Sequence, residues 1–415
     1  MAPPPPTSQP VPPPDPLPAS RRSRVPPFAV MQIVAAANER RAAGADVLSL
    51  CVGEPAGGAP AVVRRRAAEL VEHADLGYTE AAGLPALRHA IAGHYARWYG
   101  LDLDPRWVVV TTGSSGAFVL AFLAAFEHGD RVALARPGYP AYANILRALG
   151  CEVVDLPCGA AQRYQPTTAQ LDALDRPPAG LLVASPANPT GTMLDAAALD
   201  ALAAWSAAHG TRLISDEIYH GLTYAGPDGR RPPLTTAARH PDAVVVSSFS
   251  KYWAMTGWRL GWLVLPDALV DAVDALAGNI ALSPPALPQH AALAAFSEEA
   301  YAAAEAAVAR YADARALLLD RLPALGWSHV APADGAFYLY ADVSASGLDS
   351  VTWCARLLDE AGVALTPGTD FDPADGHRWV RLSFAVAPEV LSAALDRIEA
   401  WQATIGVAPD TGTTP

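Results

Sequence analysis

A single lysine stands among aromatic residues in the stretch Ser247-Ser248-Phe249-Ser250-Lys251-Tyr252-Trp253-Ala254-Met255-Thr256-Gly257-Trp258-Arg259-Leu260-Gly261-Trp262. Residues 243–246 precede it as a short β-branched run that predicts a buried strand, and residues 260–265 predict another. Lys251 therefore lies on a connection that leaves a strand. Neighbouring aromatic rings would exclude water from its amine and Arg259 would add a second cation, and both effects lower the pKa of an amine. Such an amine can react with an aldehyde, although a lysine between two strands is more often an exposed surface residue.

Strands and helices alternate on the N-terminal side of this stretch. Helical patterns separate several of the segments that predict strands, which are residues 107–112, 131–135, 152–155, 181–184 and 212–215. This alternation is typical of a mostly parallel sheet covered by helices on both faces. The C-terminal third changes character, with predicted helices at residues 298–322 and 388–401 and strand-like segments at 335–340 and 379–384. The predicted fold class is therefore α/β, with a large domain around the parallel sheet and a smaller α+β domain.

The length of 415 residues exceeds what one core usually serves, so we expect more than one domain. We predict a disordered, proline-rich tail over residues 1–27 and an N-terminal arm over 28–50 that joins the small domain. The large domain is expected at residues 51–290, the small C-terminal domain at 291–405 and a second tail at 406–415.

Composition excludes several classes of protein. The formal net charge is −13 and no basic stripe appears, which argues against a nucleic-acid-binding surface. No apolar run approaches the roughly 18 residues that a membrane helix needs, and no secretory leader pattern follows the first residues. The four cysteines lack a metal-binding or redox spacing and are expected to be small buried hydrophobic residues. We therefore expect a soluble protein of the reducing cytoplasm that binds no metal, no nucleic acid and no membrane.

Polar side chains recur just after the predicted strands. They are Ser114, Tyr139, Asn188, Asp216, Ser248 and Lys251. In an open parallel sheet, ligands bind beyond the carboxyl ends of the strands, because the loops of neighbouring strands converge there. The sequence therefore predicts one site that gathers these residues.

Their chemistry suits a flat aldehyde that carries a phosphate. Gly113-Ser114-Ser115-Gly116 opens a helix whose free N–H groups can hold a phosphate, although such a motif is also common in turns. It is not a dinucleotide fingerprint, because the GxGxxG pattern is missing. Asp216 can pair with a protonated ring nitrogen or simply cap a helix. Tyr139 offers a ring face and Asn188 an amide, and both residue types are also ordinary in turns.

Four motifs together resemble one family. They are Ser185-Pro186-Ala187-Asn188-Pro189-Thr190-Gly191, Asp216-Glu217-Ile218-Tyr219, Ser248-Phe249-Ser250-Lys251 with Gly257-Trp258-Arg259-Leu260-Gly261-Trp262, and Val380-Arg381-Leu382-Ser383-Phe384-Ala385. In order and spacing they look like the motif set of the class I/II, fold type I pyridoxal-phosphate-dependent aminotransferases. The resemblance runs from roughly residue 30 to residue 401.

The resemblance implies a role for each matching residue. Lys251 would bind the aldehyde of pyridoxal 5'-phosphate and move the proton, and Asp216 would pair with the pyridine nitrogen. Tyr219 and Asn188 would bond the ring hydroxyl oxygen. Other residues implied to hold the cofactor are Tyr139 against the ring and, around the phosphate, Ser114, Ser115, Gly116, Ser248 and Arg259.

Substrate and partner contacts are implied in the same way. Arg381 would clamp the substrate α-carboxylate, with Asn188 and the backbone of Gly53 beside the substrate. Tyr78 looks like the tyrosine that reaches the phosphate of a neighbouring subunit, which implies a homodimer with shared sites. The phosphate loop departs from several relatives at Ser114-Ser115-Gly116, and no second arginine is placed for a dicarboxylate side chain.

The activity implied is amino transfer from an L-amino acid to a 2-oxo acid by a ping-pong mechanism. An elimination, cyclisation or oxidation on the same scaffold is the alternative, because a fold does not fix the reaction. A cofactor-binding regulatory module is disfavoured by the acidic charge and by the lack of an N-terminal helix-turn-helix pattern. The residues do not identify the amino donor or the acceptor.

Overall fold

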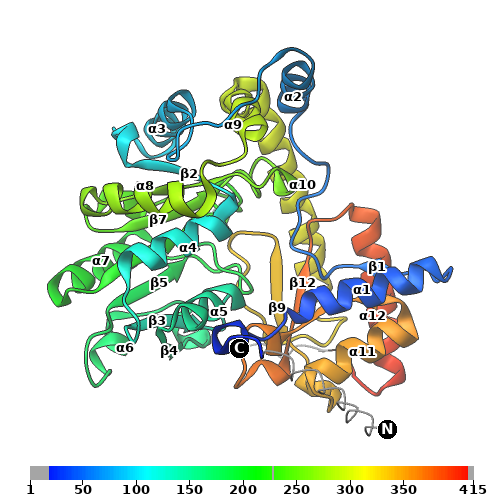
Figure 1. The fold of residues 1–415 in the computed structure, drawn as a ribbon. Coiled ribbons are helices and arrows are strands. Elements are labelled where there is room, and N and C mark those ends of the chain that lie inside the picture. The colour runs from blue at the N-terminus through cyan, green and yellow to red at the C-terminus, as the bar shows by residue number, and fades with distance from the viewer. Residues whose placement is uncertain (1–17, 227–228, 410–415) are drawn as a thin grey trace, which may run out of the picture.

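A computed structural model describes residues 18–226 and 229–409 of the chain. Its centre is a seven-stranded sheet in the order β2-β8-β7-β6-β5-β3-β4 (Figure 1). The strands are β2 (Val108–Thr111), β3 (Arg131–Arg136), β4 (Glu152–Pro157), β5 (Gly180–Ala184), β6 (Arg212–Asp216), β7 (Val244–Ser248) and β8 (Gly261–Val264). Only β8 runs antiparallel to its neighbours β2 and β7, so the predicted α/β class with a mostly parallel sheet is confirmed.

Both faces of this sheet are buried, which explains its continuous apolar strands. On β7, Val244 and Val246 pack in one core cluster while Val245 packs in the other. One cluster holds side chains from α4 (Gly113–Ala125), α5 (Pro140–Leu149) and α8 (Asp267–Ala281). The other receives side chains from α2 (Ala61–His73), α3 (Pro85–Tyr99), α6 (Thr168–Asp172), α7 (Ala196–His209) and α9 (Ala286–Ala292).

A second, smaller sheet lies beside the first, in the order β11-β12-β9 (Figure 1). Its antiparallel strands are β9 (Tyr338–Asp342), β11 (Thr366–Pro367) and β12 (Trp379–Ser383). The surrounding helices are α1 (Ala29–Ala42), α10 (Glu298–Arg321), α11 (Ser350–Ala361) and α12 (Pro388–Thr404). Near the N-terminus, β1 (Leu48–Ser49) pairs in parallel with β10 (Val363–Ala364), so the first helix and strand lie with the C-terminal third.

The predicted domain limits stay predictions, although the pairing of β1 with β10 supports an N-terminal arm that joins the small domain. Residues 1–17 and 410–415 of the two predicted tails lie outside the described residues. The rest of the N-terminal tail is described and includes a 3₁₀ turn at Arg21–Ser23. All four cysteines are buried and unpaired, as expected. In the described part of the chain, no helix is both long and apolar enough to cross a membrane.

Candidate active site

Segments from both sheets meet beyond the carboxyl ends of the parallel strands. Asp216 ends β6, Ser248 ends β7, and Asn188 and Lys251 follow β5 and β7 by a few residues. Arg381 comes from β12 of the small sheet and donates from Nη1 to Oδ1 of Asn188 at 3.0 Å. The crevice predicted from the topology therefore lies between the two sheets.

Lys251 is held by backbone and surrounded by rings. Its Nζ donates to the carbonyl oxygen of Gly53 at 2.7 Å. The same nitrogen lies 5.8 Å from the ring centre of Tyr219 and 6.0 Å from that of Phe337. Burial and, to a smaller extent, the charge of Arg381 lower the pKa of Lys251 to about 8. A larger fraction of this amine is therefore uncharged near neutral pH than in an exposed lysine, as a nucleophilic amine requires.

The groups that lower the pKa of Lys251 differ from those expected. Among the neighbouring aromatic rings, Tyr252 and Trp253 were expected to exclude water from the amine. The Tyr252 hydroxyl instead donates to Glu305, and Trp253 Nε1 donates to the Ala295 carbonyl. Both side chains belong to the apolar core. Arg381 also acts on Lys251 more strongly than Arg259, its neighbour in sequence. The prediction of a lowered pKa therefore agrees with the structure, but mainly for reasons of tertiary packing.

Asp216 is a buried carboxylate with two donors. Its oxygens accept from the Tyr142 hydroxyl and, at 3.1 Å, from the backbone N–H of Ile218. Burial raises the pKa of Asp216 to about 6, against the opposing effect of these hydrogen bonds. Tyr142 was missed in the sequence, although it stands in the first turn of α5, three residues after Tyr139, which caps that helix. A nearby cation would stabilise the charged form of this acid.

Arg381 is buried and fixed from several sides. Besides its bond to Asn188, its Nη2 donates to the carbonyl of Cys51 at 2.6 Å and to the Thr366 hydroxyl at 3.4 Å. Its Nε is buried without a hydrogen-bond partner among the described residues. Unpartnered buried N–H groups are costly, so a carboxylate bound here would satisfy a donor that the folded chain leaves open.

One end of the crevice is formed by the first turn of α4 and by Arg259. Gly113 has a φ of +66°, and a Cβ there would lie 2.5 Å from Nη2 of Arg259. Ser114, Ser115 and Gly116 follow in the same turn, where backbone N–H groups lack intrahelical partners. The Ser248 hydroxyl lies at the end of β7 and accepts from the N–H of Ser250 at 2.8 Å. The glycine thus lets the guanidinium approach a helix N-terminus, an arrangement that suits an anion.

Two predicted residues lie differently from the others. Tyr78 is 84% exposed in the single chain, as a residue that serves another subunit would be. Tyr139 lies at the start of α5, stacked on Phe28 with ring centres 6.0 Å apart. Burial raises the pKa of Tyr139 to about 12, and Asp216 and Arg381 are close enough to influence it.

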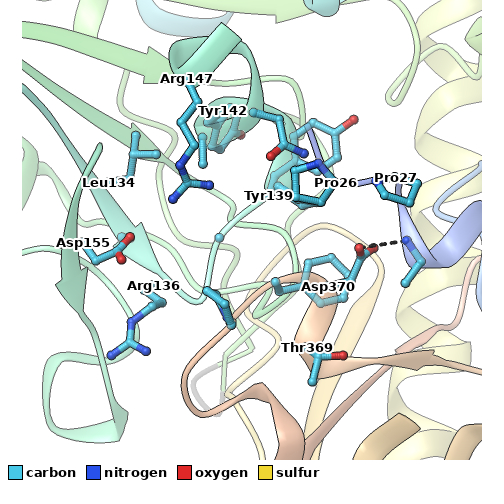
Figure 2. A pocket seen from close by; sticks show the side chains of 18 residues that line it. Pro26, Pro27, Leu134, Arg136, Tyr139, Tyr142, Arg147, Asp155, Thr369 and Asp370 are labelled. Carbon is cyan, nitrogen blue, oxygen red and sulfur yellow. Dashed lines mark hydrogen bonds between the residues drawn. The ribbon is translucent and has the colours of Figure 1, made fainter. Parts of the chain in front are cut away.

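A cavity of about 260 Å³ adjoins the outer side of this site (Figure 2). It lies between β3, α5, the N-terminal segment at Pro26 and Pro27, and the loop that carries Asp370. A dashed line in Figure 2 marks the hydrogen bond in which the N–H of Ala29 donates to Asp370 Oδ1, at 3.0 Å. Neither Lys251 nor Arg381 lines this cavity, so we do not assign it to the reaction.

Each chemical group of pyridoxal phosphate has a suitable partner among the side chains and backbone groups of the crevice. An amine of lowered pKa suits the aldehyde, and a buried carboxylate suits a protonated pyridine nitrogen. The open helix N-terminus with Arg259 suits the phosphate, and the orphaned Nε of Arg381 suits a substrate carboxylate. The residues present therefore fit this cofactor.

The family model for class I and II aminotransferases matches residues 45–398, so the chain belongs to that family. It is 52% identical over 382 residues to the valine–pyruvate aminotransferase of Mycobacterium tuberculosis, covering 92% of this chain and 97% of that protein. It is 36% identical to the aspartate/prephenate aminotransferase of Thermus thermophilus, covering 89% of this chain and 95% of the relative.

Solved structures agree with the sequence comparison. An aminotransferase structure from Mycobacterium tuberculosis has a TM-score of 0.91 at 51% identity and covers 93% of this chain and 99% of its own. The aspartate aminotransferase of Thermus thermophilus with maleate has a TM-score of 0.85 at 34% identity, covering 92% and 99%. The chain is therefore a pyridoxal-phosphate-dependent aminotransferase of fold type I, which transfers amino groups from an amino acid to a 2-oxo acid. The predicted family, cofactor and activity are confirmed.

Proposed function

We propose that this enzyme exchanges an amino group between an apolar amino acid, such as valine, and a small 2-oxo acid, such as pyruvate. The observation that carries the proposal is the 52% identity to a valine–pyruvate aminotransferase over nearly the whole of both chains. Arg381 bonds the polar side chains of Asn188 and Thr366, but four aromatic rings also lie within 6.0 Å of the two cations, and these rings are consistent with an apolar substrate. Relatives whose names include aspartate aminotransferase activity are more distant, at 30% to 36% identity.

We assign the proposed site residues as follows. Lys251 would bind the cofactor aldehyde and carry a proton to and from the substrate Cα, and Asp216 would keep the ring nitrogen protonated. Arg381 would hold the substrate carboxylate with Asn188 and Gly53 beside it. The bound cofactor supplies an electron sink that stabilises negative charge at the substrate Cα. Tyr219 and Asn188 would bond the ring oxygen, Tyr139 would cover the ring, and Ser114, Ser115, Gly116, Ser248 and Arg259 would hold the phosphate.

These residues would act in two half-reactions that share one site. In each, Arg381 orients an α-carboxylate, and the burial of Lys251 leaves part of its amine uncharged and able to accept a proton. Because the amino and oxo forms of a substrate carry the same carboxylate, one clamp serves both. One site that serves the two substrates in turn is compatible with the proposed ping-pong order.

The test is a titration of the cofactor-loaded protein with single amino acids in the absence of any oxo acid. We expect valine to convert the visible absorption of the cofactor to that of its aminated form, and pyruvate to restore it. Aspartate is the comparison substrate and should convert much less. Ammonia release without stoichiometric conversion would instead indicate elimination.

We also propose a homodimer with shared sites, because of the position of Tyr78, and a cytoplasmic location, because the four cysteines are unpaired. This tyrosine is 84% exposed in one chain, far more than an aromatic residue in a buried site. If Tyr78 serves the partner's site, a Tyr78→Ala subunit and a Lys251→Ala subunit, each inactive alone, should regain activity when mixed. Each mixed dimer would then contain one site with both residues intact. No recovery on mixing, with dimers shown by sedimentation, would place Tyr78 in its own subunit's site.

A further inference from the structure

Tyr338 is a buried tyrosine that touches three members of the proposed site. It lies on β9, one strand away from Arg381, in a register that pairs Tyr338 with Ser383 and Tyr340 with Arg381. Tyr338 and Arg381 are therefore diagonal neighbours on one face of the small sheet. The guanidinium carbon of Arg381 lies 4.5 Å from the centre of the Tyr338 ring, within the range of a cation–π contact.

The hydroxyl of the same residue lies toward the large sheet. It forms a hydrogen bond of 2.8 Å with the hydroxyl of Tyr219, the residue proposed to bond the cofactor's ring oxygen. It also lies against the backbone of Gly53, where an added Cβ would come within 1.8 Å of the Tyr338 oxygen. The Gly53 carbonyl accepts from Lys251, so Tyr338 packs directly on the segment that holds the amine.

We propose that Tyr338 is a positioning residue that links the carboxylate clamp to Tyr219, an inference that rests on the proposed function. Its ring supports the guanidinium of Arg381, and its hydroxyl orders the hydroxyl of Tyr219. When Tyr219 donates its proton to another acceptor, it can only accept from Tyr338. A hydrogen bond received in this way strengthens the one that Tyr219 donates, because chained hydrogen bonds polarise one another.

Phe371 provides a control that distinguishes the support of Arg381 from the ordering of Tyr219. Its ring centre lies 4.7 Å from the guanidinium carbon of Arg381, nearly as close as that of Tyr338. Phe371 has no hydroxyl, and its backbone carbonyl accepts from the N–H of Gly138 rather than from the Tyr219 segment. Replacing Phe371 should therefore disturb the clamp and leave Tyr219 in place.

The test compares Tyr338→Phe, Tyr338→Leu and the matched control Phe371→Leu in the cofactor-loaded protein. One readout is the pKa in a pH titration of its visible absorption, and the other is the dissociation constant of two unreactive carboxylates, acetate and 3-methylbutanoate. Tyr338→Phe should raise the spectroscopic pKa by roughly half a unit with little change in carboxylate affinity. Phe371→Leu should weaken carboxylate binding roughly 3- to 30-fold with little change in the spectroscopic pKa. Tyr338→Leu should both raise that pKa and weaken carboxylate binding.

Tyr219→Phe completes the design as the second arm of a double-mutant cycle. If the Tyr338 hydroxyl acts through Tyr219, adding Tyr338→Phe to Tyr219→Phe should not move the spectroscopic pKa further. The proposal is overturned if Tyr338→Phe leaves that pKa unchanged, or if its effect is the same in both backgrounds. Acetate keeps the outcome separate from the substrate proposal: a protein that binds acetate but neither 3-methylbutanoate nor valine would refute only the apolar substrate.

Discussion

The side chains of Arg381 and Asn188 form a hydrogen bond of 3.0 Å across 193 positions of sequence. The amide oxygen of Asn188 is the acceptor, which leaves its NH₂ group free to donate elsewhere. Asn188 belongs to the loop after β5 and Arg381 to the small sheet. One short contact therefore joins the residue proposed for the cofactor oxygen to the residue proposed for the substrate carboxylate.

Arg381→Lys should weaken substrate binding much more than cofactor binding. Lysine keeps the charge but loses the planar fork that bonds Asn188 and Cys51 while it faces a carboxylate. We expect the valine concentration for half-conversion of the cofactor to rise roughly 10- to 100-fold, since hydrogen bonds to charged groups contribute about 1.5–3 kcal/mol. Titration of cofactor-free protein with pyridoxal phosphate is the control. Equal losses in the two titrations would mean that Arg381 supports the whole site rather than the substrate.

Lys251→Ala should abolish turnover and the visible absorption that depends on a covalent bond to the cofactor aldehyde. The buried amine is the proposed nucleophile, and its lowered pKa, about 8, suits that role. Spectra and activity assays of the variant with added cofactor measure both effects. A variant that retained either property would show that Lys251 is not the reacting amine.

Asp216→Asn should change how the stability of the cofactor-free protein depends on pH. Burial raises the pKa of Asp216 from 3.8 to about 6, so the native state binds its proton more tightly than the unfolded state. The stability that this proton gives is complete below pH 3.8 and is lost as the pH rises through about 6. The asparagine variant does not titrate, so its stability relative to wild type should improve over that window, by roughly 3 kcal/mol.

Urea unfolding at several pH values measures this difference. The neighbouring acid Glu217, whose pKa burial raises to about 7, is present in both proteins and largely cancels. A stability difference that stays constant with pH would show that folding does not raise the pKa of Asp216. With pyridoxal phosphate bound, the pyridinium should reverse the preference, so that wild type gains more stability from the cofactor than the variant does.

Gly53→Ala should damage the site through Tyr338. The added Cβ would lie 1.8 Å from the Tyr338 oxygen, a distance that forces either the tyrosine or the backbone to move. We expect lower cofactor occupancy together with a higher substrate requirement, since the Gly53 carbonyl also holds Lys251. Gly93→Ala is the matched control, because a Cβ there meets nothing within 4 Å and residue 93 lies inside helix α3. Similar behaviour of the two variants would argue against the clash.

The large sheet could be predicted from the sequence because its strands are short, apolar and followed by polar residues. The run 243–246 predicted β7, which spans Val244–Ser248, and residues 212–215 predicted β6, which spans Arg212–Asp216. Helices α2, α8, α9 and α11 were not predicted. In α2 the consecutive residues Arg64, Arg65 and Arg66 interrupt the apolar pattern.

Part of the candidate site could be predicted for a different reason. Residues next to strand ends, such as Asp216 and Lys251, can be placed from topology alone. Tyr338, Phe371 and the Cys51 carbonyl could not, because each acts on Arg381 only after distant segments have packed together. Local sequence fits Tyr338 equally to a pocket for the substrate side chain and to a core strand, and it does not indicate the contact with Arg381. The same holds for Tyr252 and Trp253, which sequence proximity placed beside Lys251 and packing places in the core.

The bond from Arg381 to the Cys51 carbonyl spans 330 positions of the chain. During synthesis, every strand of the large sheet leaves the ribosome before β12 is made, so the phosphate and ring ends of the crevice can assemble on a nascent chain that cannot yet grip a substrate. Loop closure over such a separation is also slow. The capacity to bind the cofactor should therefore precede the capacity to bind an amino acid in the life of each molecule.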